Sequence, residues 1–107
     1  MDASETTIND LPTDAVVLDV CEDDEWAAGH APTAVHIPLS QLSDRIAEIP
    51  QVDGELPVIC RSGGRSARAA QFLAQQGIPA TNVLGGMQGW QLTGRPLVGD
   101  SDAPTVI

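Results

Sequence analysis

The sequence predicts an α/β fold: a three-layer sandwich in which a mostly parallel central sheet carries helices on both faces. Two observations support this prediction. Short apolar runs, typical of strands buried on both faces, alternate along the chain with segments of helical pattern. The 107 residues contain no repeat, low-complexity tract or linker, which indicates one domain. We expect a folded core over residues 5–98 and a mobile tail over residues 99–107.

The first predicted strand, residues 16–20, is a nearly continuous apolar run. Residues 23–25 are all acidic and suit the first turn of a short helix that ends near Gly29, because negative charge is favourable at the helix N-terminus. A second strand is expected over residues 34–37.

The next segment predicts a helix over residues 40–49, which Ser40 can cap. Three apolar side chains at helical spacing would form its buried face: Leu42, Ile46 and Ile49. Pro50 and the polar residues after it end the helix.

In the second half, residues 58–59 predict a third strand that leads into Cys60. A helix over residues 66–76 follows, then a fourth strand over residues 82–84 and a short helix over residues 87–92. Ligands of parallel sheets bind at the carboxyl ends of strands, and Cys60 lies at such an end.

The chain is strongly acidic, with 15 Asp and Glu residues, five arginines, no lysine and a formal net charge of −10. This charge disfavours nucleic acids and anionic membranes as general partners. Three of the five arginines, Arg61, Arg65 and Arg68, fall within eight residues, which indicates a small anionic ligand held at one place. With two cysteines, no apolar leader and no apolar run near 20 residues, we expect a reduced, cytoplasmic, monomeric protein without membrane contact.

The most informative segment is the loop after the third strand, Cys60-Arg61-Ser62-Gly63-Gly64-Arg65-Ser66. A strand, a tight glycine turn and a helix start would direct backbone N–H groups and the positive end of a helix at the Cys60 sulfur. A free thiol has a pKa near 8.5, so about 3% is thiolate at pH 7, whereas such surroundings lower the pKa. Cys60 is therefore predicted to be a nucleophile beside an anion-binding loop.

Three segments resemble the rhodanese family, specifically its single-domain sulfurtransferases. They cover most of residues 15–95 in the family's order: Leu18-Asp19-Val20 through Gly29-His30-Ala31-Pro32 to Ala34-Val35-His36-Ile37-Pro38, the Cys60–Ser66 loop with Ala67 and Ala70, and Asn82-Val83-Leu84-Gly85-Gly86-Met87 with Trp90. The resemblance implies a rhodanese-like fold in which Cys60 accepts a sulfane sulfur as a persulfide. Arg61 and Arg65 would bind an anionic donor such as thiosulfate. The backbone N–H groups that would line the cradle are those of Ser62, Gly63, Gly64, Arg65 and Ser66.

A thiol, a protein thiol or cyanide would then take the sulfur from Cys60, without a cofactor or a metal, in ping-pong kinetics. Two alternatives stay open: a non-catalytic binding module on the same fold, and a phosphatase or arsenate reductase. Related phosphatases and arsenate reductases carry five residues between cysteine and arginine, whereas four separate Cys60 from Arg65 here. The shorter ring favours a sulfane sulfur over a tetrahedral phosphate.

One position departs from the family pattern: Cys21 stands where an arginine is usual. Cys21 could relay sulfur or resolve a disulfide, but we favour a packing role. His30, His36 and Asp19 are interpreted as structural, and Arg68 as solvated or ion-paired. Gly85-Gly86 is interpreted as a strand-to-helix turn, and Trp26 and Trp90 are interpreted as packing residues.

Overall fold

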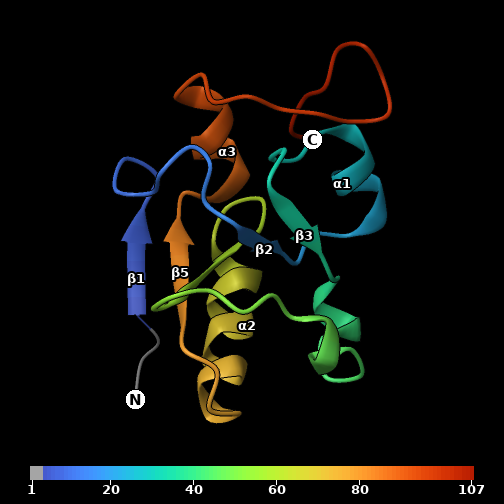
Figure 1. Ribbon diagram of the computed structural model, residues 1–107. Coiled ribbons are helices and arrows are strands. Elements are labelled where there is room, and N and C mark those ends of the chain that lie inside the picture. Colours follow the sequence, from blue (N-terminus) through green and yellow to red (C-terminus); the bar gives the residue numbers. More distant parts are fainter. Residues whose placement is uncertain (1–3) are drawn as a thin grey trace.

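The structure is a computed structural model that describes residues 4–107. Its centre is a five-stranded sheet in the order β1-β5-β4-β2-β3, in which every neighbouring pair is parallel (Figure 1). The strands are β1 Ser4–Thr7, β2 Val17–Asp19, β3 Ala34–His36, β4 Leu56–Ile59 and β5 Ala80–Leu84. The predicted α/β class is confirmed.

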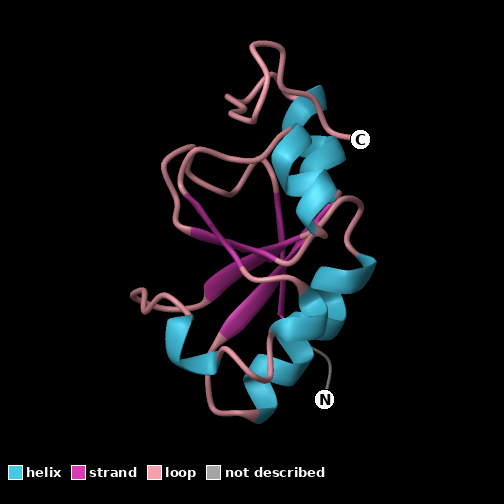
Figure 2. Cartoon of the chain, turned by 90° about the vertical axis from the view of Figure 1, so that its right-hand side faces the viewer, coloured by secondary structure: helices cyan, strands magenta, loops and turns pink. Residues whose placement is uncertain are grey.

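Three α-helices accompany the sheet: α1 Asp23–Ala28, α2 Gly64–Gln75 and α3 Gly86–Leu92. The strands cross the centre of the molecule and divide its core into two apolar clusters (Figure 2). One cluster joins β2 and β4 to α2 through Leu18, Val58 and Leu73. The other joins the opposite side of the sheet to α3, with Trp90 fully buried. Helices therefore cover both faces, as the sequence predicted.

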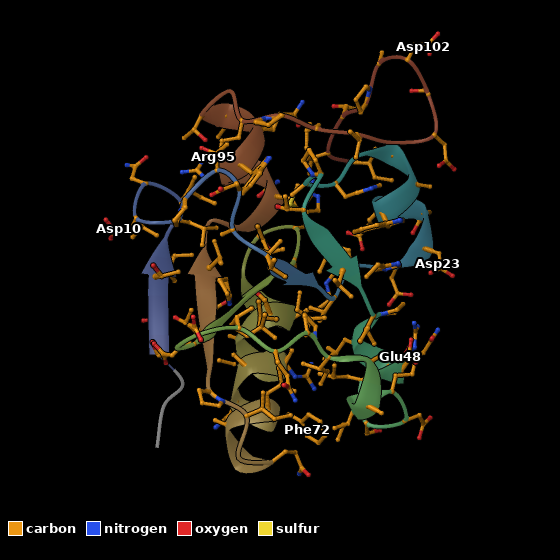
Figure 3. The ribbon with its side chains drawn as sticks, viewed as in Figure 1. Asp10, Asp23, Glu48, Phe72, Arg95 and Asp102 are labelled. Atoms are coloured by element: carbon orange, nitrogen blue, oxygen red, sulfur yellow. The ribbon has the colours of Figure 1, made fainter. Side chains whose placement is uncertain are left out.

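The edge strand β1 was not predicted from the sequence. Its residues, Ser-Glu-Thr-Thr, are polar and largely exposed, so they lack the apolar pattern of a buried strand. The strand forms because its backbone pairs with β5, from Ser4 opposite Thr81 to Thr7 opposite Leu84. Just after the C-terminal end of β1, Arg95 Nη2 donates to the carbonyl oxygen of Ile8, and the Arg95 guanidinium lies over the Trp90 ring. Figure 3 labels Arg95 on this side of the molecule.

The predicted helix over residues 40–49 is wrong. Two short 3-10 turns, Leu39–Gln41 and Ile46–Glu48, replace it. Arg45 between them has φ −123°, outside the helical region. Ser43 and Asp44 precede this break, and both residue types favour turns over helix interiors. Leu42 is buried nonetheless, so the apolar residues anchor the crossover without a continuous helix.

Residues 98–107, which include the whole tail that we expected to be mobile (residues 99–107), make specific contacts. This C-terminal segment runs from the end of α3 across to α1 (Figure 1). Val98 forms an antiparallel bridge with His30, and the Thr105 N–H donates to the Ala28 carbonyl at 3.0 Å. Asp102 lies on the outward-looping part of the segment (Figure 3). Within residues 4–107, no helix combines the length and apolar character needed to cross a membrane.

Candidate active site

The carboxyl edge of the sheet positions Cys60. In the register of β2 and β4, Asp19 pairs with Ile59, so the residues after both strands leave the sheet at one edge. The chain turns through Gly63, whose φ of 118° favours glycine, and α2 begins at Gly64. The helix therefore starts two residues earlier than predicted, and its first turn lies closer to the sulfur.

Three hydrogen-bonding groups surround the Cys60 sulfur. The N–H groups of Gly63 and Ser66 donate to Sγ at 3.1 and 3.3 Å, and the Ser66 hydroxyl lies 3.2 Å from Sγ. Burial by itself raises the pKa of the Cys60 thiol, because it penalises the thiolate. The hydrogen bonds from Ser66, Gly63 and the Ser62 N–H outweigh burial and hold the pKa below its usual value. The loop is therefore built to stabilise a negative sulfur.

Asn82 extends this arrangement and was not recognised as a site residue from the sequence. It lies on β5, is buried, and its Oδ1 accepts a hydrogen bond of 2.6 Å from the Ser66 hydroxyl. The single hydroxyl proton of Ser66 thus goes either to Asn82 Oδ1 or to the Cys60 thiolate, and a protonated Cys60 can itself donate to Ser66 Oγ. A polar asparagine at the start of an apolar run was the available signal, because a buried amide needs a partner.

The N-terminus of α3 binds the Cys60 loop through two backbone hydrogen bonds. The N–H groups of Met87 and Gln88 donate to the carbonyl oxygens of Cys60 and Arg61 at 2.7 and 3.0 Å. In a planar trans peptide the C=O and the N–H point in opposite directions. Anchoring these two carbonyls on α3 therefore turns the N–H groups of Arg61 and Ser62 the other way, and the Ser62 N–H reaches Cys60.

Gly86 makes this approach possible. A Cβ at this position would run into the Cys60 carbonyl oxygen and lie 2.7 Å from that of Arg61, and its φ is +54°. The Gly85-Gly86 pair is thus a strand-to-helix turn, as interpreted from the sequence. Because its following amides bind the loop, the turn supports the cradle.

Arg65 is held by a carboxylate 40 residues away. Its Nη1 and Nη2 donate to the two carboxylate oxygens of Glu25 in α1, at 2.6 and 2.8 Å. These hydrogen bonds are the main cause of the lowered pKa of Glu25. The pair clamps the start of α2 onto α1, a structural role that the sequence analysis missed because Glu25 was assigned only to a helix turn. Donor binding by Arg65 stays a prediction.

The other two arginines of the cluster differ in their contacts. Arg61 Nε donates to the carbonyl oxygen of Ile107 in the C-terminal segment at 2.6 Å. The Arg68 side chain is exposed and makes no hydrogen bond or ion pair with any other part of residues 4–107, in line with its interpretation as solvated.

Comparison with known proteins agrees with this geometry. The rhodanese-like domain family matches residues 4–93. The chain belongs to this family. A sulfurtransferase of Allochromatium vinosum is 36% identical over 86 residues, which are 79% of this chain and 79% of that protein. These similarities support sulfur transfer as the general chemistry of this rhodanese-like domain.

Solved structures give the same assignment. A rhodanese-related protein of Thermoplasma volcanium superposes with a TM-score of 0.79 at 34% identity, covering 89% of this chain and 97% of its own. A thiosulfate sulfurtransferase of Pseudomonas aeruginosa gives a TM-score of 0.68 at 30% identity over 82% of this chain, although the match spans only 17% of that larger chain. The rhodanese-like fold is thus shown.

Cys21, where the rhodanese pattern has an arginine, is buried beside Asp19. The Cys21 N–H donates to Asp19 Oδ1 at 2.9 Å, so Asp19 fixes the loop backbone as expected. Burial is the main cause that raises the pKa of the Cys21 thiol, and the negative charge of Asp19 adds to it. A thiol held neutral is a poor nucleophile, which favours packing over sulfur relay.

Both histidines of the rhodanese-like domain take part in structural hydrogen bonds. His30 Nδ1 donates to the Trp26 carbonyl and His36 Nε2 to the Cys21 carbonyl, each at 2.7 Å. The Trp26 ring stacks on both imidazoles, with centroids 3.4 and 4.6 Å away. Among residues 4–107, no three His, Cys, Asp or Glu side chains gather as metal ligands would.

Proposed function

We propose that this domain is a sulfurtransferase that carries a sulfane sulfur as a Cys60 persulfide. The donor is thiosulfate or another persulfide, and the acceptor is a thiol or cyanide. One observation carries the proposal: Cys60 Sγ lies within 3.3 Å of two loop N–H groups and of the Ser66 hydroxyl, at the N-terminus of α2. Such a site stabilises the thiolate that the first step requires.

In the first half-reaction the Cys60 thiolate attacks the outer sulfur of thiosulfate. A new S–S bond forms on Cys60, the S–S bond of the donor breaks, and sulfite leaves with the electron pair. Oriented N–H groups and an arginine stabilise the negative charge that accumulates on the leaving group. The hydrogen bonds that lower the pKa of the Cys60 thiol favour the thiolate that this attack requires, and the Cys60 proton goes to solvent.

In the second half-reaction an acceptor thiolate or cyanide attacks the outer sulfur of the persulfide, and Cys60 leaves as a thiolate. The same hydrogen bonds that stabilise the resting thiolate make it a good leaving group. The four residues between Cys60 and Arg65 form a narrow ring, which suits a single sulfur atom better than a phosphate group. The name of the Pseudomonas aeruginosa relative supports thiosulfate as donor.

Intact-protein mass spectrometry tests the proposal. After brief incubation with thiosulfate, the protein should gain the mass of one sulfur atom and lose it on addition of cyanide. Cys60→Ser should show no gain, because an alcohol does not form the persulfide. Cys21→Ser is the matched control and should gain sulfur as the unsubstituted protein does. No gain with thiosulfate or with polysulfide would overturn the proposal and favour a binding module.

A further inference from the structure

The C-terminal segment, residues 98–107, lies beyond the part of the chain that the rhodanese-like family matches, which ends at residue 93. It nevertheless contacts two helices and ends against the Cys60 loop. A segment outside the family's domain that reaches the candidate site calls for a functional explanation of its own.

The first anchor of the segment is the end of α1. His30 and Val98 exchange two backbone hydrogen bonds of 2.8 and 2.9 Å, and Thr105 N–H donates to Ala28. Gly29 lets the two backbones meet, because a Cβ there would lie 2.6 Å from the Thr105 carbonyl oxygen. Gly29 has an extended backbone with φ −178°, so only the close approach of Thr105 requires a glycine at this position.

The second anchor is Gln91 on α3. Its Nε2 donates to the Thr105 hydroxyl at 3.0 Å, and its Oε1 accepts from the Val106 N–H at 3.1 Å. The Val106 side chain packs against the apolar cluster that contains Trp90. The segment is thus fixed on both sides immediately before its last residue.

The last contact of the segment is with Arg61. The Ile107 carbonyl accepts from Arg61 Nε at 2.6 Å, while Arg61 Nη1 and Nη2 make no hydrogen bond within residues 4–107. In Arg65, by contrast, both Nη atoms are bound to Glu25. Arg61 is therefore the loop arginine whose Nη groups are available to an anion, while the C-terminal segment binds its Nε.

We propose that the C-terminal segment is a positioning element that holds Arg61 ready for an anionic sulfur donor beside Cys60. The inference deepens the proposed function and rests on it for the identity of the donor. An arginine loses substantial rotamer freedom when it is immobilised on a ligand. The Ile107 contact removes part of that freedom before the donor arrives, so the segment favours anions over neutral reagents.

Two substitutions release the segment without touching the loop. Gly29→Ala places a methyl group against the Thr105 backbone, and Gln91→Ala removes both side-chain bonds. They are tested singly and together. Gln75→Ala, an exposed residue of α2, is the matched control, and Arg61→Ala sets the limit for complete loss of the positive charge.

The first measurement is the rate of Cys60 alkylation by iodoacetate, an anion, relative to neutral iodoacetamide, followed by peptide mass spectrometry. We expect this ratio to fall about three- to tenfold in the double variant, toward that of Arg61→Ala, with the iodoacetamide rate changed less than about twofold. The KM for thiosulfate should rise by a similar factor at nearly constant kcat. Gln75→Ala should keep the original values.

An iodoacetate preference that is unchanged or raised in the single and double variants would overturn the inference. The alkylation assay needs no sulfur transfer, so the two proposals fail separately. If no persulfide forms but the alkylation ratio shifts as expected, the proposed function and the sulfur donor are refuted, whereas the positioning of Arg61 by the segment is supported. A protein that forms the persulfide and shows no shift loses only the role of the segment.

Discussion

Replacing Ser66 with alanine isolates one contribution to the reactivity of Cys60. Ser66 Oγ lies 3.2 Å from Cys60 Sγ, and the Ser66 N–H that donates to the same sulfur is kept in Ser66→Ala. The side-chain hydrogen bond is one of the causes that lower the pKa of Cys60 against the opposing effect of burial. We expect less thiolate at neutral pH in the variant.

The upper limit of the effect is the strength of one hydrogen bond to a charged group, about 1.5–3 kcal/mol, because the Ser66 proton is shared between Cys60 Sγ and Asn82 Oδ1. At 1.36 kcal/mol per decade, the fraction of thiolate below the thiol pKa falls at most roughly 10- to 150-fold. A less stabilised thiolate is more nucleophilic, with a Brønsted coefficient of about 0.4–0.5. The alkylation rate of Cys60 at fixed pH should therefore fall by no more than about 4- to 15-fold.

Both quantities can be measured on the same protein. The ultraviolet absorbance of the thiolate, titrated against pH, gives its fraction, and iodoacetamide gives the rate. Ser40→Ala, at an exposed position, is the matched control and should leave both unchanged. Because Ser66→Ala also leaves Asn82 Oδ1 without its donor, thermal unfolding is followed separately. An unchanged titration in a folded Ser66→Ala protein would refute the role assigned to the hydroxyl.

Three further predictions concern stability. Gly86→Ala should cost at least about 2 kcal/mol in urea unfolding, because its methyl group meets the Cys60 carbonyl at a positive φ; an unchanged midpoint would contradict this. Glu25→Gln should lower the free energy of unfolding by about 1–3 kcal/mol at pH 7, a value between those typical of an exposed and of a buried ion pair. The folded-state pKa of Glu25 is lowered, so this difference is present above pH 4.5 and should shrink as the pH falls through that pKa; a constant difference would exclude the Arg65 pair as its cause. Burial raises the pKa of Asp19 above 3.8, so the free energy of unfolding should fall as the pH rises and Asp19 ionises. Asp19→Asn should not show this fall when urea unfolding is measured at several pH values; the same pH dependence in both proteins would contradict the prediction.

The parts of the fold that local sequence encodes were predicted well. The runs that became β2 and β4 are apolar because both faces of those strands are covered. The order strand, glycine turn, helix placed Cys60 correctly at the carboxyl edge. The helix expected over residues 40–49 failed because apolar spacing alone does not outweigh turn-forming residues in its middle.

The contacts that complete the site join distant parts of the chain. Arg65 meets Glu25 across 40 residues, Arg61 meets Ile107 across 46, and Ser66 meets Asn82 from the neighbouring strand β5. No periodicity relates such pairs, since each depends on how the layers stack. The sequence therefore indicated which residues could bind an anion, but not which arginine was already engaged.

The charge of the protein explains why that distinction matters. A body with net charge −10 repels an anionic donor, and salt screens this repulsion beyond about 8 Å. Recognition must then come from groups at contact distance. Glu25 offsets the charge of Arg65. No Asp or Glu side chain within residues 4–107 forms an ion pair with Arg61, so the Arg61 Nη atoms and the loop N–H groups that α3 orients are available to an anion. We therefore expect Arg61→Ala to weaken thiosulfate binding more than Arg68→Ala, since Arg61 adjoins the nucleophile and Arg68 lies a turn further along α2.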